Sequence, residues 1–130
     1  MTPTITSLYA GLLALMLVPL SFRVIRMRYR KHIGILDGGD QEMACAMRAH
    51  GNFTEYVPLS LILMALVEIN GAPHYLMHLF GAVLVGGRVL HAIGLSHSPG
   101  ASRSRVAGMI ATFAVLISSG VTALTQFSGA

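Results

Sequence analysis

The fold is decided by residues 106–125, which read VAGMIATFAVLISSGVTALT and contain no charged side chain. A helix crossing the hydrocarbon core of a bilayer needs about 20 predominantly apolar residues, and this segment supplies that length without interruption. Its Ala, Gly, Ser and Thr residues are typical of helices that pack closely against other helices inside a membrane. The segment therefore predicts a membrane-spanning helix.

The composition of the whole chain agrees with a membrane protein. Of the 130 residues, 54% are hydrophobic and 11% are charged, whereas a soluble domain carries roughly 25% charged residues. The mean hydropathy is +0.67. The formal charge of +4 and the pI near 9.8 do not indicate nucleic-acid binding, because the basic residues adjoin hydrophobic runs and form no solvated face. A chain of this length has room for about four spans and no separate soluble domain.

Three further apolar segments precede residues 106–125. Residues 5–22 carry no charge, and the basic residues that follow them argue against a cleaved signal peptide, which has its positive charges in front. The breaker residues 70–73 (NGAP) separate the second and third segments. We therefore expect an all-α, integral membrane four-helix bundle that forms a single domain over residues 1–130, with spans at about 5–24, 43–69, 74–95 and 104–126.

The distribution of Lys and Arg predicts the orientation of these spans. Five basic residues lie between the first and second spans, two (Arg103 and Arg105) lie between the third and fourth, and none lies at the termini or between the second and third. Cytoplasmic loops carry an excess of Lys and Arg. Both chain termini are therefore expected on the non-cytoplasmic side, as an even number of spans allows.

The polar residues inside the second span share one face. At 100° per residue, Asn52 and Glu55 lie at 40° and minus 20° from Arg48, and Tyr56 flanks them at 80°. In the third span, Arg88 and His91 are separated by three residues and point the same way. Because ionisable side chains are costly in a membrane, each needs a partner, a cavity or access to the interface.

We interpret the two polar faces as one cytoplasm-facing cup. Glu55 is too deep in the second span for its short side chain to reach the interface, so we expect it to pair with Arg88. Several Arg side chains, a carboxylate and an amide suit a small zwitterionic, peptide-like ligand. The alternative is structural: Arg48 and Arg88 would reach the headgroups, and Glu55 would be an ion-pair partner that fixes helix packing.

Other candidate motifs carry less information. His74 and His78 have the spacing of a metal-ligand pair, but no third ligand accompanies them, so we predict no metal site. The single cysteine, Cys45, excludes an intrachain disulfide and is interpreted as a packing residue. No phosphate loop, dinucleotide fingerprint or HExxH motif is present.

The start of the second span resembles a known family signature. Residues 48–58 (RAHGNFTEYVP) are similar to the R-x-x-x-N-x-x-E-Y-x-P signature of the MAPEG family, the membrane-associated proteins in eicosanoid and glutathione metabolism. Residues 87–91 (GRVLH) resemble the G-R-x-x-H segment of the same family, and the four-span layout extends the resemblance over the whole chain. Within the family, the chain looks most like the small bacterial branch, which implies a bacterial inner membrane.

The resemblance implies a homotrimer that binds glutathione as a co-substrate near the cytoplasmic side. It implies a glutathione transferase or peroxidase type of activity, in which a thiolate attacks a lipophilic electrophile that arrives from the bilayer. A basic residue at the start of the fourth span would stabilise the thiolate, and Arg103 is assigned this role with Arg105 as the alternative. By the same analogy, the ligand-binding residues are Arg26 (with Arg28 as the alternative), Arg48, Asn52, Glu55, Tyr56, Arg88 and His91.

Two positions depart from the family pattern. Leu95 and Ala107 stand where several characterised members have a tyrosine. Their presence favours an alternative in which the protein is a non-catalytic membrane scaffold that holds a lipid or a thiol.

A small-solute transporter is less well supported, because the chain has no internal repeat and no pair of interrupted helices. The sequence does not identify the electrophile or the physiological ligand.

Overall fold

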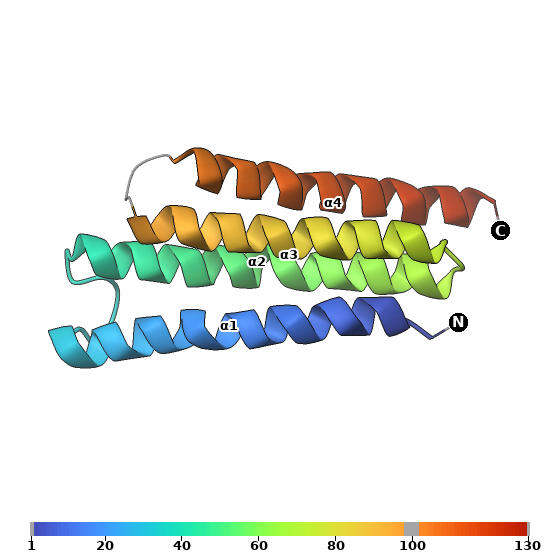
Figure 1. Cartoon of the computed structure of the whole chain (residues 1–130). Coiled ribbons are helices and arrows are strands. Elements are labelled where there is room, and N and C mark those ends of the chain that lie inside the picture. Colours follow the sequence, from blue (N-terminus) through green and yellow to red (C-terminus); the bar gives the residue numbers. More distant parts are fainter. Residues whose placement is uncertain (1, 98–101, 130) are drawn as a thin grey trace.

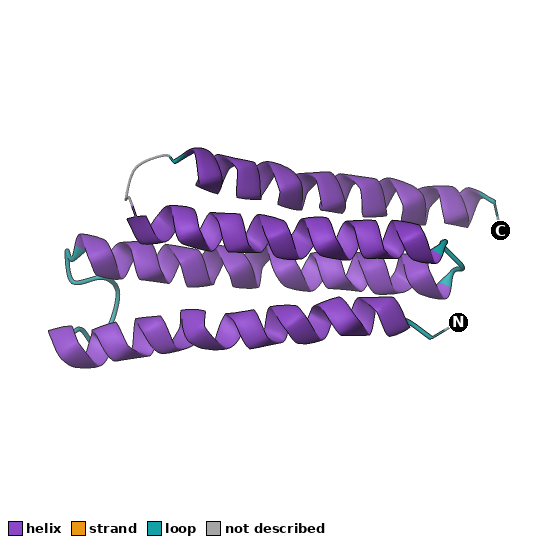
Figure 2. Ribbon diagram, in the orientation of Figure 1, coloured by secondary structure: helices purple, strands orange, loops and turns teal. Residues whose placement is uncertain are grey.

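The computed structural model is a bundle of four long helices (Figures 1 and 2). It describes residues 2–97 and 102–129, and for residues 95–97 the backbone alone. Within these ranges every regular element is a helix: α1 Thr4–Lys31, α2 Gln41–Ile69, α3 His74–His97 and α4 Arg103–Ser128. All four are long and apolar enough to cross a membrane. The predicted all-helical fold with four membrane-length helices is confirmed, and each predicted span lies inside one of them. The middle of the predicted loop between the third and fourth spans lies outside the described residues.

The helices run up and down, so the bundle has two distinct ends (Figure 1). One end carries both chain termini and the short α2–α3 turn, and the other carries the α1–α2 and α3–α4 connections. Helices α2 and α3 lie in the middle: α1 packs against both of them from one side and α4 from the other. In the described part of the chain, α1 and α4 do not contact each other. We call the two ends the terminal end and the loop end.

The α1–α2 connection at the loop end is fixed by short polar contacts. Helix α1 is followed by His32, which adopts the left-handed conformation. Helix α2 begins after Asp40, whose carboxylate accepts a hydrogen bond of 2.8 Å from the backbone N–H of Met43. The Lys31 ammonium lies 2.7 Å from both oxygens of the same carboxylate. The hydrogen bond from Lys31 has the larger effect on the pKa of Asp40, and the bond from the Met43 N–H has the smaller one. Together they hold this pKa below its ordinary value of 3.8. The carboxylate thus caps one helix and ties it to the end of the other.

Helices α3 and α4 approach each other closely at two glycines, Gly87 and Gly108. A Cβ atom on Gly108 of α4 would collide with the Gly87 carbonyl oxygen and lie 2.7 Å from the His91 backbone nitrogen. A Cβ atom on Gly87 would lie 2.9 Å from the Ala111 Cβ. Small residues let helix backbones pack this closely in a membrane. The contact fixes α4 against the part of α3 that carries His91.

Glu68 joins α2 to the start of α1 at the terminal end. Its carboxylate oxygens accept hydrogen bonds of 2.8 and 2.7 Å from the backbone N–H groups of Ile5 and Thr6. Pro3 precedes α1 and supplies no side-chain cap, so Glu68 satisfies N–H groups that would otherwise lack a partner in the helix. The side chain is buried, with 4% of the residue exposed. No motif or periodicity in the sequence predicts this contact of Glu68.

Candidate functional site

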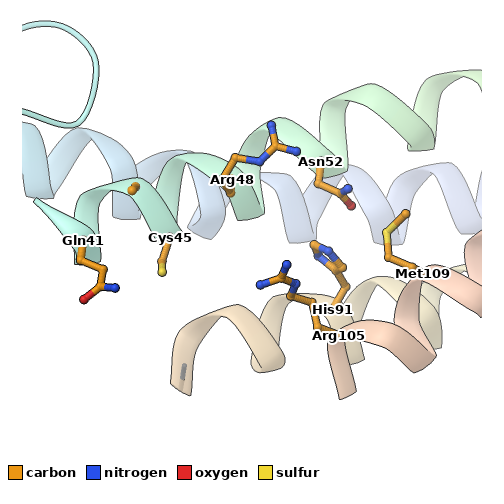
Figure 3. Close-up of a pocket in the computed structure, with 8 residues that line it drawn as sticks. Gln41, Cys45, Arg48, Asn52, His91, Arg105 and Met109 are labelled. Atoms are coloured by element: carbon orange, nitrogen blue, oxygen red, sulfur yellow. The ribbon is translucent and has the colours of Figure 1, made fainter. Parts of the chain in front are cut away.

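A cavity of about 410 Å³ lies at the loop end of the bundle, between α2, α3 and α4 (Figure 3). Its size falls in the range of small-molecule sites. Helix α2 supplies most of the lining, α3 contributes one residue and α4 contributes two. The lining residues are Gln41, Ala44, Cys45, Arg48, Asn52, His91, Arg105 and Met109.

Helical periodicity explains why one face of α2 lines the cavity. Gln41, Cys45, Arg48 and Asn52 follow one another at intervals of four, three and four residues, which keeps their side chains on a single face. Figure 3 shows them along α2, with the side chains of Gln41, Cys45 and Asn52 turned toward the other two helices and the Arg48 guanidinium turned away from them. Of the predicted polar face of the second span, Arg48 and Asn52 line the cavity, and Glu55 and Tyr56 do not. The lining extends toward the start of the helix as far as Gln41.

Arg88 lies buried beneath the cavity and contacts Asn52. One of its terminal nitrogens, Nη2, donates a hydrogen bond of 2.7 Å to the Asn52 Oδ1, and only 1% of Arg88 is exposed. The Nε and Nη1 groups of Arg88 have no hydrogen-bond partner among the described residues. This contact orients the Asn52 amide and leaves its Nδ2 group free to donate a hydrogen bond to a ligand.

The predicted ion pair between Glu55 and Arg88 is wrong within the subunit. The Glu55 carboxylate lies 3.7 Å from the Arg48 guanidinium, and 54% of the Glu55 side chain is exposed. Asn52 and Glu55 are three residues apart and differ by about 60° around the helix. Because α3 meets α2 on the Asn52 side, Arg88 reaches Asn52 while Glu55 faces away from the bundle.

His91 and Arg105 bring the other two helices to the cavity. His91 is 4% exposed, and no side chain or backbone group in the described part of the chain forms a hydrogen bond with its ring. Arg105 lies in the first turn of α4, where Ser102 caps the helix by accepting a hydrogen bond of 3.3 Å from the Arg105 N–H. Both residues line the cavity opposite α2, and the His91 ring is turned toward Asn52 (Figure 3).

Besides Glu55 and Arg88, three further predicted site residues do not line the cavity. Arg26 is exposed on α1, and Arg103 is exposed at the first position of α4. The Tyr56 ring packs edge-to-face against Phe113 of α4, with ring centres 5.4 Å apart. Of the paired alternatives, Arg105 rather than Arg103 reaches the cavity, whereas Arg28 donates to the carbonyl oxygens of Ile33 and Leu36 in the α1–α2 connection.

Four lining residues were not among the predicted site residues: Gln41, Ala44, Cys45 and Met109. Cys45 lies about 60° from Arg48 around α2, and extending the polar face by one turn would have included both Cys45 and Gln41. Met109 follows Arg105 by four residues on α4 and carries no polar signal that a sequence pattern could single out.

The charges of the lining favour an anionic ligand. Arg48 and Arg105 are cationic, His91 offers an imidazole, and none of the lining residues is an Asp or a Glu. Arg guanidinium groups recognise carboxylates through paired hydrogen bonds. Within the described ranges no three His, Cys, Asp or Glu side chains come together as a metal-binding group. The residues of the cavity are thus suited to a carboxylate-bearing molecule that also offers amide groups.

Comparison with known proteins assigns the chain to a family. A model of the MAPEG family matches residues 6–125. The chain is 41% identical over 113 residues to the inner membrane protein YecN of Escherichia coli strain K12, an alignment that covers 87% of this chain and 85% of that protein. The same protein from Escherichia coli O6:H1 gives the same identity and coverage. This chain therefore belongs to the MAPEG family.

Proposed function

We propose that this protein binds glutathione in the cavity at the loop end and uses its thiolate to attack lipophilic electrophiles from the bilayer. One observation carries the proposal. The family-signature residues Arg48 and Asn52 line the same cavity as His91 and as Arg105. Two cations, an imidazole and an amide complement a tripeptide that has two carboxylates, two peptide groups and one thiol.

The described residues suggest how the tripeptide would be held. The guanidinium of Arg48 would bind a carboxylate, and the Asn52 Nδ2, oriented by Arg88, would donate to a peptide carbonyl. Arg105 would lie beside the sulfur. A free thiol has a pKa near 8.5, and a guanidinium close to the sulfur favours the thiolate, which is the nucleophilic form. Arg105 replaces Arg103 in this role because it lines the cavity.

A homotrimer would account for the exposure of Glu55. A carboxylate that faces hydrocarbon is costly, and the Arg48 guanidinium at 3.7 Å is its only ion-pair partner in the described part of the chain. A second copy of the chain packed over this face of α2 would cover Glu55 and Arg48 and bring them to the edge of the ligand. We therefore retain Glu55 and Tyr56 as ligand-site residues between neighbouring subunits, together with Arg26 from the end of α1.

The proposal places the protein in the bacterial inner membrane with both termini on the non-cytoplasmic side. The relative in Escherichia coli is named as an inner membrane protein. The five basic residues between the first and second spans and the two before residue 106 all lie at the loop end, which is the cavity end. By the positive-inside rule this end faces the cytoplasm.

A non-catalytic scaffold that holds a thiol or a lipid is the second candidate. Ala107 is exposed on α4 and offers no hydroxyl group, and the Leu95 side chain lies outside the described residues. Two positions with a tyrosine in several family members therefore supply no phenol here. Ligand binding without turnover would fit this arrangement.

Calorimetry on the purified protein in detergent would test the proposal. We expect saturable binding of glutathione, weakened at least about tenfold, or 1.4 kcal/mol, by Arg48→Ala and by Arg105→Ala. Arg30→Ala is the matched control, because Arg30 is an exposed cation of α1 that lies outside the cavity. No binding by the folded wild-type protein would refute the proposal.

A second assay would separate the transferase from the scaffold. Turnover of a chlorinated nitrobenzene in the presence of glutathione, reduced by Arg105→Ala more than by Arg103→Ala, is the transferase outcome. Binding of glutathione with no turnover of this or other electrophiles would favour the scaffold. Glu55→Ala would report on the subunit interface, and we expect it to weaken both binding and trimer formation.

A further inference from the structure

We propose that Cys45 is a thiol–disulfide exchange site for an anionic peptide disulfide that binds in the cavity, with glutathione disulfide as the representative of this class. The inference extends the proposed function, since it assumes that the cavity accepts glutathione-like peptides. It assigns to Cys45 a chemical role in place of the packing role expected from the sequence.

The position of Cys45 carries the first part of the inference. Its side chain lines the cavity together with Arg48, three residues further along α2, and with Arg105 of α4. The thiol forms no disulfide and is partly exposed. Figure 3 shows the Cys45 sulfur turned away from α2, toward the side on which α3 and α4 lie. A disulfide held in the cavity would therefore lie next to a free thiol of the protein.

His91 supplies an independent indication that this space is built for a ligand. The residue is 96% buried, lines the same cavity and has no hydrogen-bond partner in the described part of the chain. Its ring nitrogens are open to the cavity and are not sealed in the core. A bound molecule with carboxylate or amide groups would form hydrogen bonds with the imidazole. We therefore interpret the cavity that contains Cys45 as a ligand site.

The exchange reaction needs no additional oxidant. The thiolate of Cys45 attacks one sulfur of the disulfide, a new sulfur–sulfur bond forms, and the original sulfur–sulfur bond breaks. The released peptide thiolate takes up the proton that the Cys45 thiol gave to solvent. Cys45 is oxidised to a mixed disulfide, and half of the peptide disulfide is reduced to the free thiol. A second peptide thiol reverses the step and regenerates Cys45.

The lining also predicts which disulfides react. The cavity has two guanidinium groups and no carboxylate among its lining residues, so it attracts a disulfide of net negative charge and repels one of net positive charge. Glutathione disulfide belongs to the first class and cystamine to the second. The selectivity should therefore come from the folded cavity and should disappear when the chain is unfolded.

Intact-mass spectrometry of the full-length protein in detergent would test the inference. We expect a single mixed disulfide that is absent from Cys45→Ser, formed at least about tenfold faster with glutathione disulfide than with cystamine. We also expect Arg105→Gln to reduce this ratio and Arg30→Gln to leave it unchanged. Equal rates with the two disulfides, or modification only after unfolding in dodecyl sulfate, would overturn the inference.

The same samples separate this inference from the proposed function. If the wild-type protein binds reduced glutathione in the calorimeter but Cys45 does not react selectively, the exchange site is refuted and the proposed function stands. If Cys45 reacts selectively with glutathione disulfide but reduced glutathione does not bind, the proposed function fails and the exchange site is supported.

Discussion

Buried polar groups occur at both ends of the bundle, but at one end they bond helices together and at the other they adjoin a cavity. At the terminal end, both oxygens of Glu68 accept backbone hydrogen bonds from α1, and the Gln126 amide of α4 donates to the Val67 carbonyl at 3.1 Å. At the loop end, Arg88 has one partner and two nitrogens without one, and His91 has no hydrogen-bond partner among the described residues. The first set joins helices, while the second borders a cavity.

The comparison shows how to distinguish a structural polar group from a ligand-binding one inside a membrane bundle. Both kinds are buried, and both are costly if left without a partner. What differs is what the groups adjoin: Glu68 and Gln126 bond to backbone groups of neighbouring helices, whereas Arg88 and His91 adjoin a cavity. Atoms without a hydrogen-bond partner occur at both ends of the described bundle, as Thr6 Oγ1 and Gln126 Oε1 at the terminal end show. Mutations at the terminal end should therefore change stability without changing ligand binding, and mutations in the cavity should do the reverse.

The largest effect is expected at the terminal end. Glu68→Ala removes two charge-assisted hydrogen bonds and leaves the N–H groups of Ile5 and Thr6 buried without acceptors, so the free energy of unfolding should fall by about 3 kcal/mol. Thermal unfolding in detergent would measure the loss. Glutathione binding at a temperature where the variant is folded should not change. Glu68→Gln, which keeps one acceptor oxygen, should lose less. A melting temperature equal to that of the wild type would show that the cap contributes nothing.

The second effect tests the glycine contact that shapes the loop end. Gly108→Ala places a methyl group against the Gly87 carbonyl and the His91 backbone, and overpacking of this kind costs about 2 kcal/mol. Because α4 must move away from α3, glutathione binding should weaken as well. Gly120→Ala is the matched control on the same helix, since a Cβ atom there meets nothing within 4 Å. Equal behaviour of the two variants would contradict the close contact.

The third effect uses the buried cation of the loop end. Arg88→Met replaces a desolvated guanidinium by an apolar side chain, so we expect the free energy of unfolding to change by less than about 1 kcal/mol. Glutathione affinity should nevertheless fall about tenfold, because Asn52 loses the group that orients it. Calorimetry and thermal unfolding on the same preparation would measure both quantities. A large loss of stability with unchanged affinity would make Arg88 a structural residue like Glu68.

The smallest effect concerns Asp40, which lies outside the membrane-spanning helices. Its folded pKa is lowered by Lys31, so its charge stabilises the fold above pH 3.8, and this contribution is lost as the pH falls through the folded pKa. Asp40→Asn keeps a capping side chain for α2. The variant should therefore melt slightly below the wild type at neutral pH and together with it well below pH 3.8. A difference that persists in acid would point to the cap instead of the charge.

Much of the fold could be predicted from the sequence because membrane length and apolar composition are local properties. The face of α2 that carries Arg48 and Asn52 was also predictable, since helical periodicity fixes which residues share a face. The hydrogen-bond partner of Arg88 could not be predicted from the sequence. Asn52 and Glu55 are both polar and only about 60° apart, and the packing of α3 against one side of α2 decides between them. No pattern within α2 contains that information.

The position of Arg105 at the cavity and the contacts of Glu68 also depend on how the helices pack against one another. Arg103 and Arg105 are about 200° apart on α4, so the choice between them depends on how α4 is rotated against its neighbours. The bond partners of Glu68 are 62 and 63 residues away in the chain, and an acidic residue near the end of an apolar helix gives no sign of them. Both features are determined by contacts between distant parts of the chain, which helical periodicity does not predict.

The cap that Glu68 places on α1 also bears on the order in which the protein can mature during synthesis. Helix α1 leaves the ribosome first, yet the acceptor for its first N–H groups is made only at the end of α2. The α1–α2 hairpin is therefore the smallest nascent unit in which the start of α1 finds its partner. Until that hairpin closes, the start of α1 depends on water at the membrane surface, which keeps it at the interface while the second helix inserts.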